Sequence, residues 1–259
     1  MITLPEFPLD GLGRIGAAAI LILISLIISR WREADLEKDL LIATLRSFVQ
    51  LIAIGYALEF IFNLDSPLWT LTLLVLMTTI AGRTAAQRGK NIPHAQWVAL
   101  VSIGLGSALT LGILVAVNVF TFDPQTIIPV GGMVIGNSMS VAALVMKRLA
   151  SDFHDQRNLI ETSLALGATS QQAARPQLRT SLQSAMIPIV DTTKTTGLIK
   201  LPGAMTGMIL AGASPMEAVQ IQIVVLYMII GASAFTGLTA SYLTYRQFFT
   251  PAHQLCFAD

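Results

Sequence analysis

Five polar or sulfur-bearing residues stand in or beside long apolar stretches: Glu59, Asn137, Asp191, Lys194 and Met205. Charged side chains inside a membrane span are costly, so they pair with one another or line a path for a polar solute. Asp191 and Lys194 are three residues apart and can pair on one helix face. The thioether of Met205 prefers soft ions but is also an ordinary packing group. Structural pairing and the lining of a translocation path both stay open, and no set of metal ligands can be read.

The residues needed for common catalytic sites are missing. The chain has one cysteine, Cys256, and three widely separated histidines, His94, His154 and His253, with no HExxH sequence. A disulfide, a CxxC metal site and a catalytic zinc site are therefore not expected. A Walker A motif is also absent, so the chain is not expected to bind ATP by a P-loop. An intramembrane enzyme would pair a histidine with an acid or nucleophile, and no apolar stretch contains a histidine.

The composition identifies an integral membrane protein. Hydrophobic residues make up 54% of the 259 residues and charged residues only 12%, and the mean hydropathy is +0.69. A soluble domain carries about 25% charged residues. The net charge of +1 gives no electrostatic attraction to nucleic acid. We expect an all-α fold, a polytopic membrane helix bundle surrounded by lipid, as a single permease domain over 1–259.

About 20 apolar residues are needed to span a bilayer. Five stretches meet this length approximately, a sixth is apolar but interrupted by Pro188, Pro202 and Gly203, and a seventh follows. The sixth is either one kinked span or an interfacial helix followed by a short crossing helix. The stretches are Gly11–Ser29, Leu41–Phe62, Leu68–Gly82, Trp97–Phe120, Ile127–Met146, Ala185–Ala213 and Ala218–Tyr242.

The distribution of basic residues predicts the orientation. Of 16 Lys and Arg residues, 12 follow the first, third, fifth and seventh stretches. The loops after the second, fourth and sixth stretches hold none. Because basic loops stay in the cytoplasm, we expect about seven transmembrane helices with the N-terminus outside and the C-terminus inside. The first stretch has no basic residues before it, so it is not expected to be a cleaved signal peptide.

The longest polar segment, 147–184, is expected to be a cytoplasmic helix–turn–helix, which we call the knob. Its first helix is predicted over Asp152–Leu166 and ends at Gly167, a residue typical of helix C-termini. Thr169 or Ser170 can cap a second helix over Gln171–Gln183. The knob either protrudes as a docking element or is a connector packed on its own bundle.

The sequence of the knob resembles the EAA loop of ABC-transporter permeases. The resemblance lies in Glu161-Thr-Ser-Leu-Ala-Leu-Gly167-Ala-Thr and rests on Glu161, Ala165 and Gly167. The family's downstream I-x-L-P does not occur at the usual spacing, and Ala185-Met-Ile-Pro188 comes several residues late. In that family the loop is a coupling helix that fits a cleft on the ATPase subunit. The resemblance therefore implies ATPase contacts through Glu161, Leu164, Ala165, Gly167, Ala168 and Thr169.

Further motifs are similar to the FetB-type permease family of bacterial iron exporters and to plant aluminium-tolerance permeases. They include Gln50-Leu-Ile-Ala-Ile-Gly55-Tyr, Ile128-Pro-Val-Gly-Gly-Met133, Leu201-Pro-Gly-Ala-Met205 and Tyr242-Leu-Thr-Tyr-Arg246. The resemblance implies a homodimeric permease in the bacterial inner membrane and iron export. It also implies a cytoplasmic ABC ATPase subunit that carries the ATP and Mg, with no cofactor in this chain. The alternatives are export of another metal or small solute, and a scaffold or channel without ATP coupling.

Overall fold

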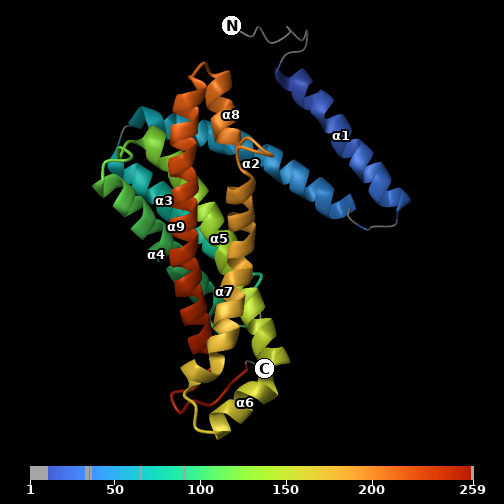
Figure 1. Ribbon diagram of the computed structural model, residues 1–259. Coiled ribbons are helices and arrows are strands. Elements are labelled where there is room, and N and C mark those ends of the chain that lie inside the picture. The colour runs from blue at the N-terminus through green and yellow to red at the C-terminus, as the bar shows by residue number, and fades with distance from the viewer. Residues whose placement is uncertain (1–10, 33–34, 36, 65, 90–91, 258–259) are drawn as a thin grey trace. The chain divides into compact units, whose positions relative to one another are not determined.

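The computed structural model describes residues 11–32, 35, 37–64, 66–89 and 92–257. Within these residues it contains nine α-helices and no β-strand, apart from two isolated bridges (Figure 1). The prediction of an all-helical fold is therefore confirmed for the described part. The chain divides into two compact units, 1–63 and 64–259. The single permease domain over 1–259 stays a prediction.

The helices follow one another with short connections. The first unit holds α1 and most of α2, and the second unit holds the rest. The bounds are α1 Gly11–Trp31, α2 Glu37–Leu64, α3 Pro67–Ala86, α4 Ala95–Ala116, α5 Pro124–Asp155, α6 Arg157–Ala165, α7 Ser170–Thr195, α8 Gly203–Leu210 and α9 Pro215–Gln247.

Five helices are long and apolar enough to cross a membrane. They are α2 over Glu37–Glu59, α3, α4, α5 and α9, and α1 adds a shorter apolar helix over Gly16–Trp31. The eight residues of α8 are too few to span a bilayer alone. These findings support a membrane helix bundle, while the count of seven spans and the orientation of the termini stay predictions.

The first unit consists of two apolar helices whose side chains are mostly exposed. Leu21, Ile27, Leu45 and Leu51 are all more than half exposed. A helix that is apolar around its circumference suits lipid rather than water. Glu37 and Asp39 lie in the first turn of α2, where negative charge is favourable at a helix N-terminus.

The core of the second unit forms where α9 packs along α4, α5 and α7 (Figure 1). The closest approach is at Gly106 of α4, where a Cβ atom would lie 2.0 Å from Oγ1 of Thr236 in α9. The hydroxyl of Thr236 in turn donates to Ser138 of α5 at 3.0 Å. Small residues and hydroxyls at such crossings are how membrane helices pack in the absence of a hydrophobic driving force.

Glycines of the fifth predicted span also allow close packing, but against α3. A Cβ at Gly131 would lie 2.5 Å from Leu74 Cδ2, and one at Gly132 would lie 3.2 Å from Met77 Cε. A Cβ at Gly136 meets nothing within 4 Å. Close packing on α3 therefore occurs at two of these three glycines.

The sixth predicted stretch is two helices and not one kinked span. α7 ends at Thr195 and α8 begins at Gly203, with Pro202 as its N-cap. Pro188 was expected to interrupt this stretch, and that expectation is wrong because it lies inside α7. Proline is tolerated within membrane helices where neighbouring groups satisfy the freed backbone carbonyl.

Candidate functional site

The apex of the knob is a tight turn held by local backbone hydrogen bonds. Gly167 has φ of +92°, and its N–H donates to Leu164 O at 3.0 Å while Ala168 N–H donates to Ser163 O at 3.1 Å. This pair of bonds is a Schellman motif, which requires a left-handed residue at the position of Gly167. Thr169 then caps α7 through a reciprocal capping box with Gln172. The prediction that Gly167 ends one helix is confirmed, and of the two candidates for the next cap, Thr169 and Ser170, the cap is Thr169.

The bounds of the knob helices differ from the prediction. α5 continues from the apolar region to Asp155, so a helix beginning at Asp152 is wrong, and a break at Gln156 separates it from α6. α7 continues twelve residues beyond Gln183, the predicted end of the second helix, to Thr195. Helix ends set by tertiary packing rather than by caps leave little local signal.

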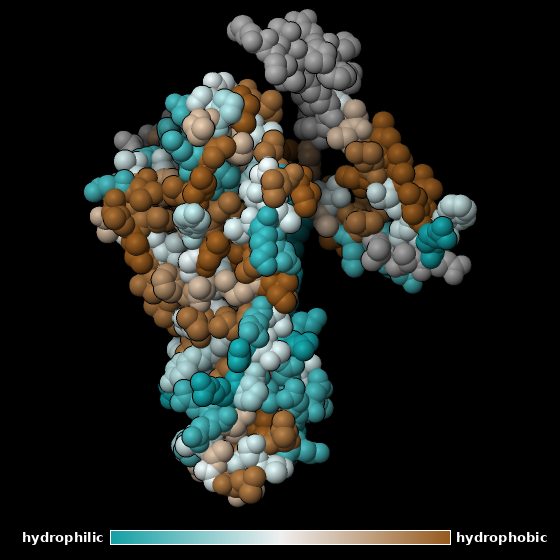
Figure 2. Space-filling model, viewed as in Figure 1, coloured by the Kyte–Doolittle hydropathy of each residue, from teal (hydrophilic) through white to brown (hydrophobic). Residues whose placement is uncertain are grey.

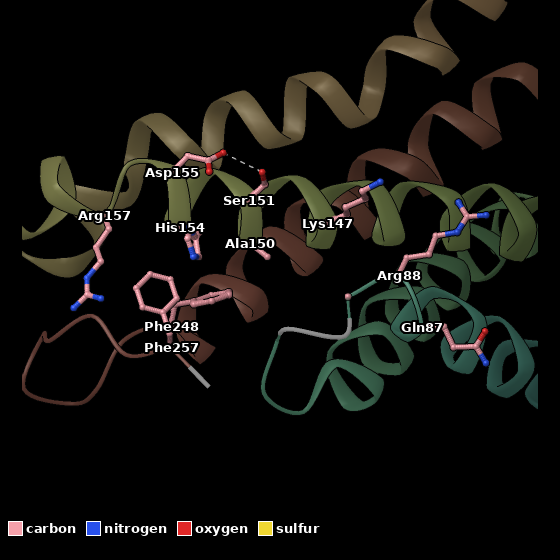
Figure 3. A pocket seen from close by; sticks show the side chains of 11 residues that line it. Gln87, Arg88, Lys147, Ala150, Ser151, His154, Asp155, Arg157, Phe248 and Phe257 are labelled. Atoms are coloured by element: carbon pink, nitrogen blue, oxygen red, sulfur yellow. Dashed lines mark hydrogen bonds between the residues drawn. The ribbon is translucent and has the colours of Figure 1, made fainter. Parts of the chain in front are cut away.

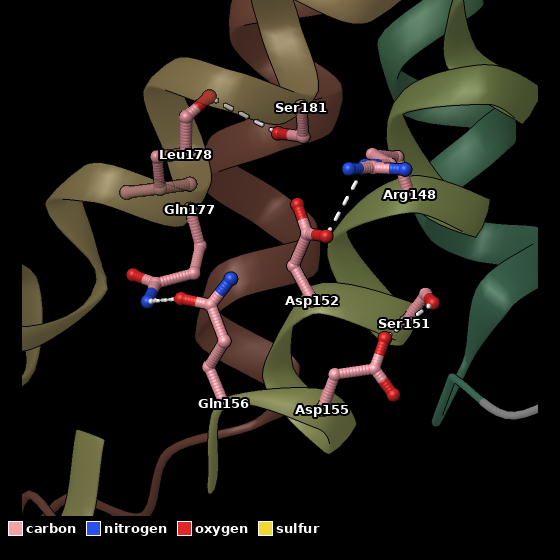
Figure 4. A network of polar contacts seen from close by, with 8 residues as sticks. All are labelled: Arg148, Ser151, Asp152, Asp155, Gln156, Gln177, Leu178 and Ser181. Carbon is pink, nitrogen blue, oxygen red and sulfur yellow. Dashed lines mark hydrogen bonds and ion pairs between the residues drawn. The ribbon is translucent and has the colours of Figure 1, made fainter. Parts of the chain in front are cut away.

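Polar contacts lie at the base of the knob, where α5 ends. Asp152 is nearly buried and pairs with Arg148 at 3.1 Å (Figure 4). The side-chain amides of Gln156 and Gln177 lie 2.8 Å apart and join the α5–α6 break to α7. Ile160 of α6 is fully buried. The knob is therefore a rigid continuation of the bundle and not a mobile loop.

The free end of the knob exposes apolar side chains. Figure 2 shows hydrophilic side chains over most of this end of the molecule and a hydrophobic spot at its tip. Leu166 is 85% exposed and Leu159 is 60% exposed. Glu161 is also exposed, and its Oε1 lies 2.7 Å from Arg157 Nε in an ion pair along α6. Exposed apolar groups with a polar rim are typical of protein-binding surfaces.

The other predicted coupling residues lie near this end. Leu164 and Ala168 are half-buried, whereas Ala165 and Thr169 are exposed. Leu164, Ala165 and Ala168 line a shallow cavity of about 420 Å³ together with residues of the C-terminal tail. Four of the six coupling candidates thus lie on α6 or line the cavity beside it, Gly167 lies in the turn, and Thr169 caps α7.

The C-terminal tail, residues 248–257, packs against the knob, and sequence reasoning did not predict this. His253 Nδ1 lies 2.8 Å from Ser170 Oγ, which lies 2.8 Å from Tyr245 Oη. Phe153 of α5 makes edge-on contacts with Phe248 and Phe249 at 5.1 and 5.8 Å. The one available signal was the presence of three phenylalanines among the ten residues of the tail.

The candidate path residues lie on different helices. Asp191 and Lys194 are exposed on α7, Asn137 is half-buried on α5, Met205 is half-buried on α8, and Glu59 is exposed on α2. The amide of Asn137 donates to Met133 O at 2.8 Å, which leaves its oxygen free to accept. Among the described residues, no group of three or more His, Cys, Asp or Glu side chains is arranged to hold a metal ion.

Asp191 and Lys194 do not form the ion pair that their spacing allows. The two ion pairs within the described ranges are Arg148–Asp152 and Arg157–Glu161. The side chains of Asp191 and Lys194 on α7 are both exposed, and an exposed ion pair contributes little free energy of folding. The two charges therefore stand separately on an open helix face.

Comparison with known proteins assigns the family. The model of the uncharacterised protein family UPF0014 matches residues 12–249. The chain is 44% identical over 247 residues to Protein ALUMINUM SENSITIVE 3 of Arabidopsis thaliana, covering 95% of this chain and 90% of that protein. It is 46% identical over 239 residues to UPF0014 membrane protein STAR2 of rice, Oryza sativa subsp. japonica, covering 92% and 84%.

A bacterial relative has a more specific name. The chain is 36% identical over 238 residues to the probable iron export permease protein FetB of Escherichia coli, with 92% of each chain covered. No solved structure matches the chain. With a family model that spans nearly all of its helices, the chain belongs to the UPF0014 family of membrane proteins.

Proposed function

We propose that the chain is the membrane permease subunit of an ABC exporter, driven by ATP that a separate cytoplasmic ATPase subunit hydrolyses. The observation that carries this proposal is the knob, a rigid helix–turn–helix with an exposed apolar tip at Leu166. A docking element must be rigid to transmit movement and must offer apolar area to a partner. The name of the similar E. coli protein, a probable iron export permease, supports the same function.

The open face of α7 supports a path for a polar solute. Asp191 and Lys194 are exposed without an ion-pair partner within the part of the chain that the structure describes. Figure 2 shows hydrophilic side chains along α7 beside the hydrophobic side chains of the neighbouring helices. Charged groups are not stable against lipid, so this face borders water or a second protein surface. We propose that it lines the pathway, covered in part by a second copy of the permease in the bacterial inner membrane.

Iron is the proposed substrate, because of the name of the similar E. coli protein and because oxygen donors are available. Asn137 and Asp191 supply an amide and a carboxylate oxygen, ligands suited to harder cations. Transport would follow closure of the two ATPase subunits, which would move the knob and open the pathway to the outside. Another metal or a small solute is the alternative substrate for the same machinery.

Cellular iron content tests this function. Cells that lack the protein should hold more iron and grow worse when iron loading is combined with peroxide. In cells that lack both the permease and its ATPase, restoring the two together should lower cell iron, and restoring either alone should not. If deletion leaves the iron content of the cells unchanged while another metal accumulates, iron is rejected as the substrate but the exporter function stands. Unchanged levels of every metal and solute, with the ATPase still bound, would reject export and favour a scaffold.

A further inference from the structure

A basic cavity of about 680 Å³ lies at the base of the knob, where three parts of the second unit meet. One wall is the end of α3 and the residues after it, another is the last part of α5, and the third is the C-terminal tail. Figure 3 shows Arg88 and Lys147 toward one end, Arg157 at the other end, and the rings of Phe248 and Phe257 between them. None of the predicted coupling or path residues lines this cavity.

The positive charge at one end of the cavity has no counter-charge in the described chain. Arg88 and Lys147 form no ion pair, since the two ion pairs of the described residues involve Arg148 and Arg157. The acidic lining residue, Asp155, accepts a hydrogen bond from Ser151 at 3.1 Å along its own helix. Two neighbouring cations without an acidic partner favour binding of an external anion.

The depth of the two cations places them beside lipid headgroups. Residues 124–146 of α5 contain no charged side chain, and Lys147 directly follows this stretch. Arg88 comes two residues after the last residue of α3, another helix of membrane-spanning length. About 20 apolar residues cross the hydrocarbon layer, so both cations lie where that layer ends and the phosphate groups of the lipids begin.

The wall that carries Arg88 is fixed in place. The N–H groups of Arg88 and Gly89 donate to Ala85 O and Ala86 O at 3.1 and 2.9 Å. Gly89 is buried so closely against α5 that a Cβ atom there would lie 2.6 Å from Met146 Cε. Opposite, Phe257 lies edge-on to Phe248 at 5.9 Å. The cavity is therefore formed before any ligand binds, which lowers the entropic cost of binding.

We propose that this cavity binds a phosphate group between Arg88 and Lys147, and that its source is the headgroup of an anionic phospholipid from the adjacent leaflet. A phosphodiester at the membrane surface reaches both cations, because Arg88 and Lys147 lie at the same depth in the membrane as the lipid phosphate groups. A bound headgroup would brace the end of α3, α5 and the tail that supports the knob. A soluble phosphate ester offers the same chemistry and is distinguished by experiment. The proposal does not depend on ATP coupling.

The test measures lipid binding to the purified full chain in detergent. Dioleoylphosphatidylglycerol is titrated in mixed micelles, with dioleoylphosphatidylcholine as the zwitterionic comparison, and bound lipid is counted by native mass spectrometry. Each cation at a membrane surface contributes about 1 kcal/mol, so Arg88→Gln with Lys147→Gln should weaken phosphatidylglycerol binding about 30-fold. The matched control, Arg83→Gln with Arg246→Gln, removes two exposed charges outside the cavity and should bind as the wild type does.

A second variant separates the cavity from diffuse surface charge. Ala150→Trp keeps every charge but fills the cavity that Ala150 lines, so it should also lose phosphatidylglycerol binding. Equal binding by wild type, the double Gln variant and Ala150→Trp would overturn the proposal, as would equal binding of the two lipids. Displacement of the lipid by millimolar inorganic phosphate would assign the site to a soluble ester instead. Loss of ATPase binding with unchanged lipid binding in the double Gln variant would assign the cavity to the partner protein.

Discussion

His253 Nδ1 accepts hydrogen bonds from both the N–H and the hydroxyl of Ser170, at 3.4 and 2.8 Å. Because Nδ1 accepts from the N–H, it carries no proton, and the Ser170 hydroxyl is the donor to it. The hydroxyl of Tyr245 then donates to Ser170 Oγ at 2.8 Å. The tail thus satisfies one of the free N–H groups at the start of α7, just beyond the apex of the knob.

Removal of the imidazole should loosen the knob. His253→Ala leaves a buried N–H and hydroxyl at Ser170 without the acceptor, a loss of about 1–3 kcal/mol. Amide hydrogen exchange over residues 166–173 should accelerate, while exchange in α4 should not. Cys256→Ser is the matched control, because it is an exposed tail residue with no bond to the knob. Unchanged exchange in His253→Ala would show that the tail does not hold the turn.

The local features of the knob were predictable from sequence, and its long-range support was not. Gly167 and Thr169 act through hydrogen bonds between residues at most five apart in the chain, so residue type and spacing were sufficient. The contact of His253 with Ser170 joins residues 83 apart in the chain, and no periodic pattern encodes such a pair. The continuation of α7 through Pro188 was missed for the same reason, since neighbouring helices and not propensity decide it.

The packing of α4 on α9 should fail when Gly106 gains a side chain. Gly106→Ala places a Cβ 2.0 Å from Thr236 Oγ1 and 3.0 Å from its backbone nitrogen. Overpacking of this kind costs about 1–3 kcal/mol, so the unfolding midpoint in detergent should fall. Gly112→Ala is the matched control on the same helix, because nothing lies within 4 Å of its Cβ. Equal midpoints for the two variants would contradict the close crossing.

The charges on α7 should affect transport and not stability. Asp191→Asn removes an exposed carboxylate that forms no ion pair, so the unfolding midpoint should stay near that of the wild type. Transport in proteoliposomes should fall, because the path loses a ligand or a favourable charge. The swap Asp191→Lys with Lys194→Asp should recover no more than either single change. Full recovery by the swap would show that the two residues pair in the working protein.

The start of α5 should carry a pH-dependent cap. Hydrogen bonds from the Thr121 hydroxyl and then from Thr126 hold the pKa of Asp123 below its ordinary value. A lowered folded-state pKa means that this stabilisation is complete above the unfolded pKa of about 3.9 and is lost as the pH falls through the folded value. The unfolding midpoint should therefore drop in acid less steeply for Asp123→Asn, which still caps the helix. The acid dependence of the midpoint in Thr121→Ala should lie between those of the wild type and Asp123→Asn. Identical acid profiles for the three proteins would contradict this role of Asp123.

ATPase stimulation by the reconstituted permease tests coupling through the knob most directly. Gly167→Leu forces a side chain into a left-handed turn at φ +92°, which costs about 1–2 kcal/mol, and adds bulk at the apex. Gly212 has φ of +98° in the same type of turn between α8 and α9, so Gly212→Leu applies the same strain at a site remote in sequence from the knob. We expect both variants to insert, Gly167→Leu to leave the ATPase at its basal rate, and Gly212→Leu to stimulate it. Full stimulation by Gly167→Leu would contradict coupling through the knob.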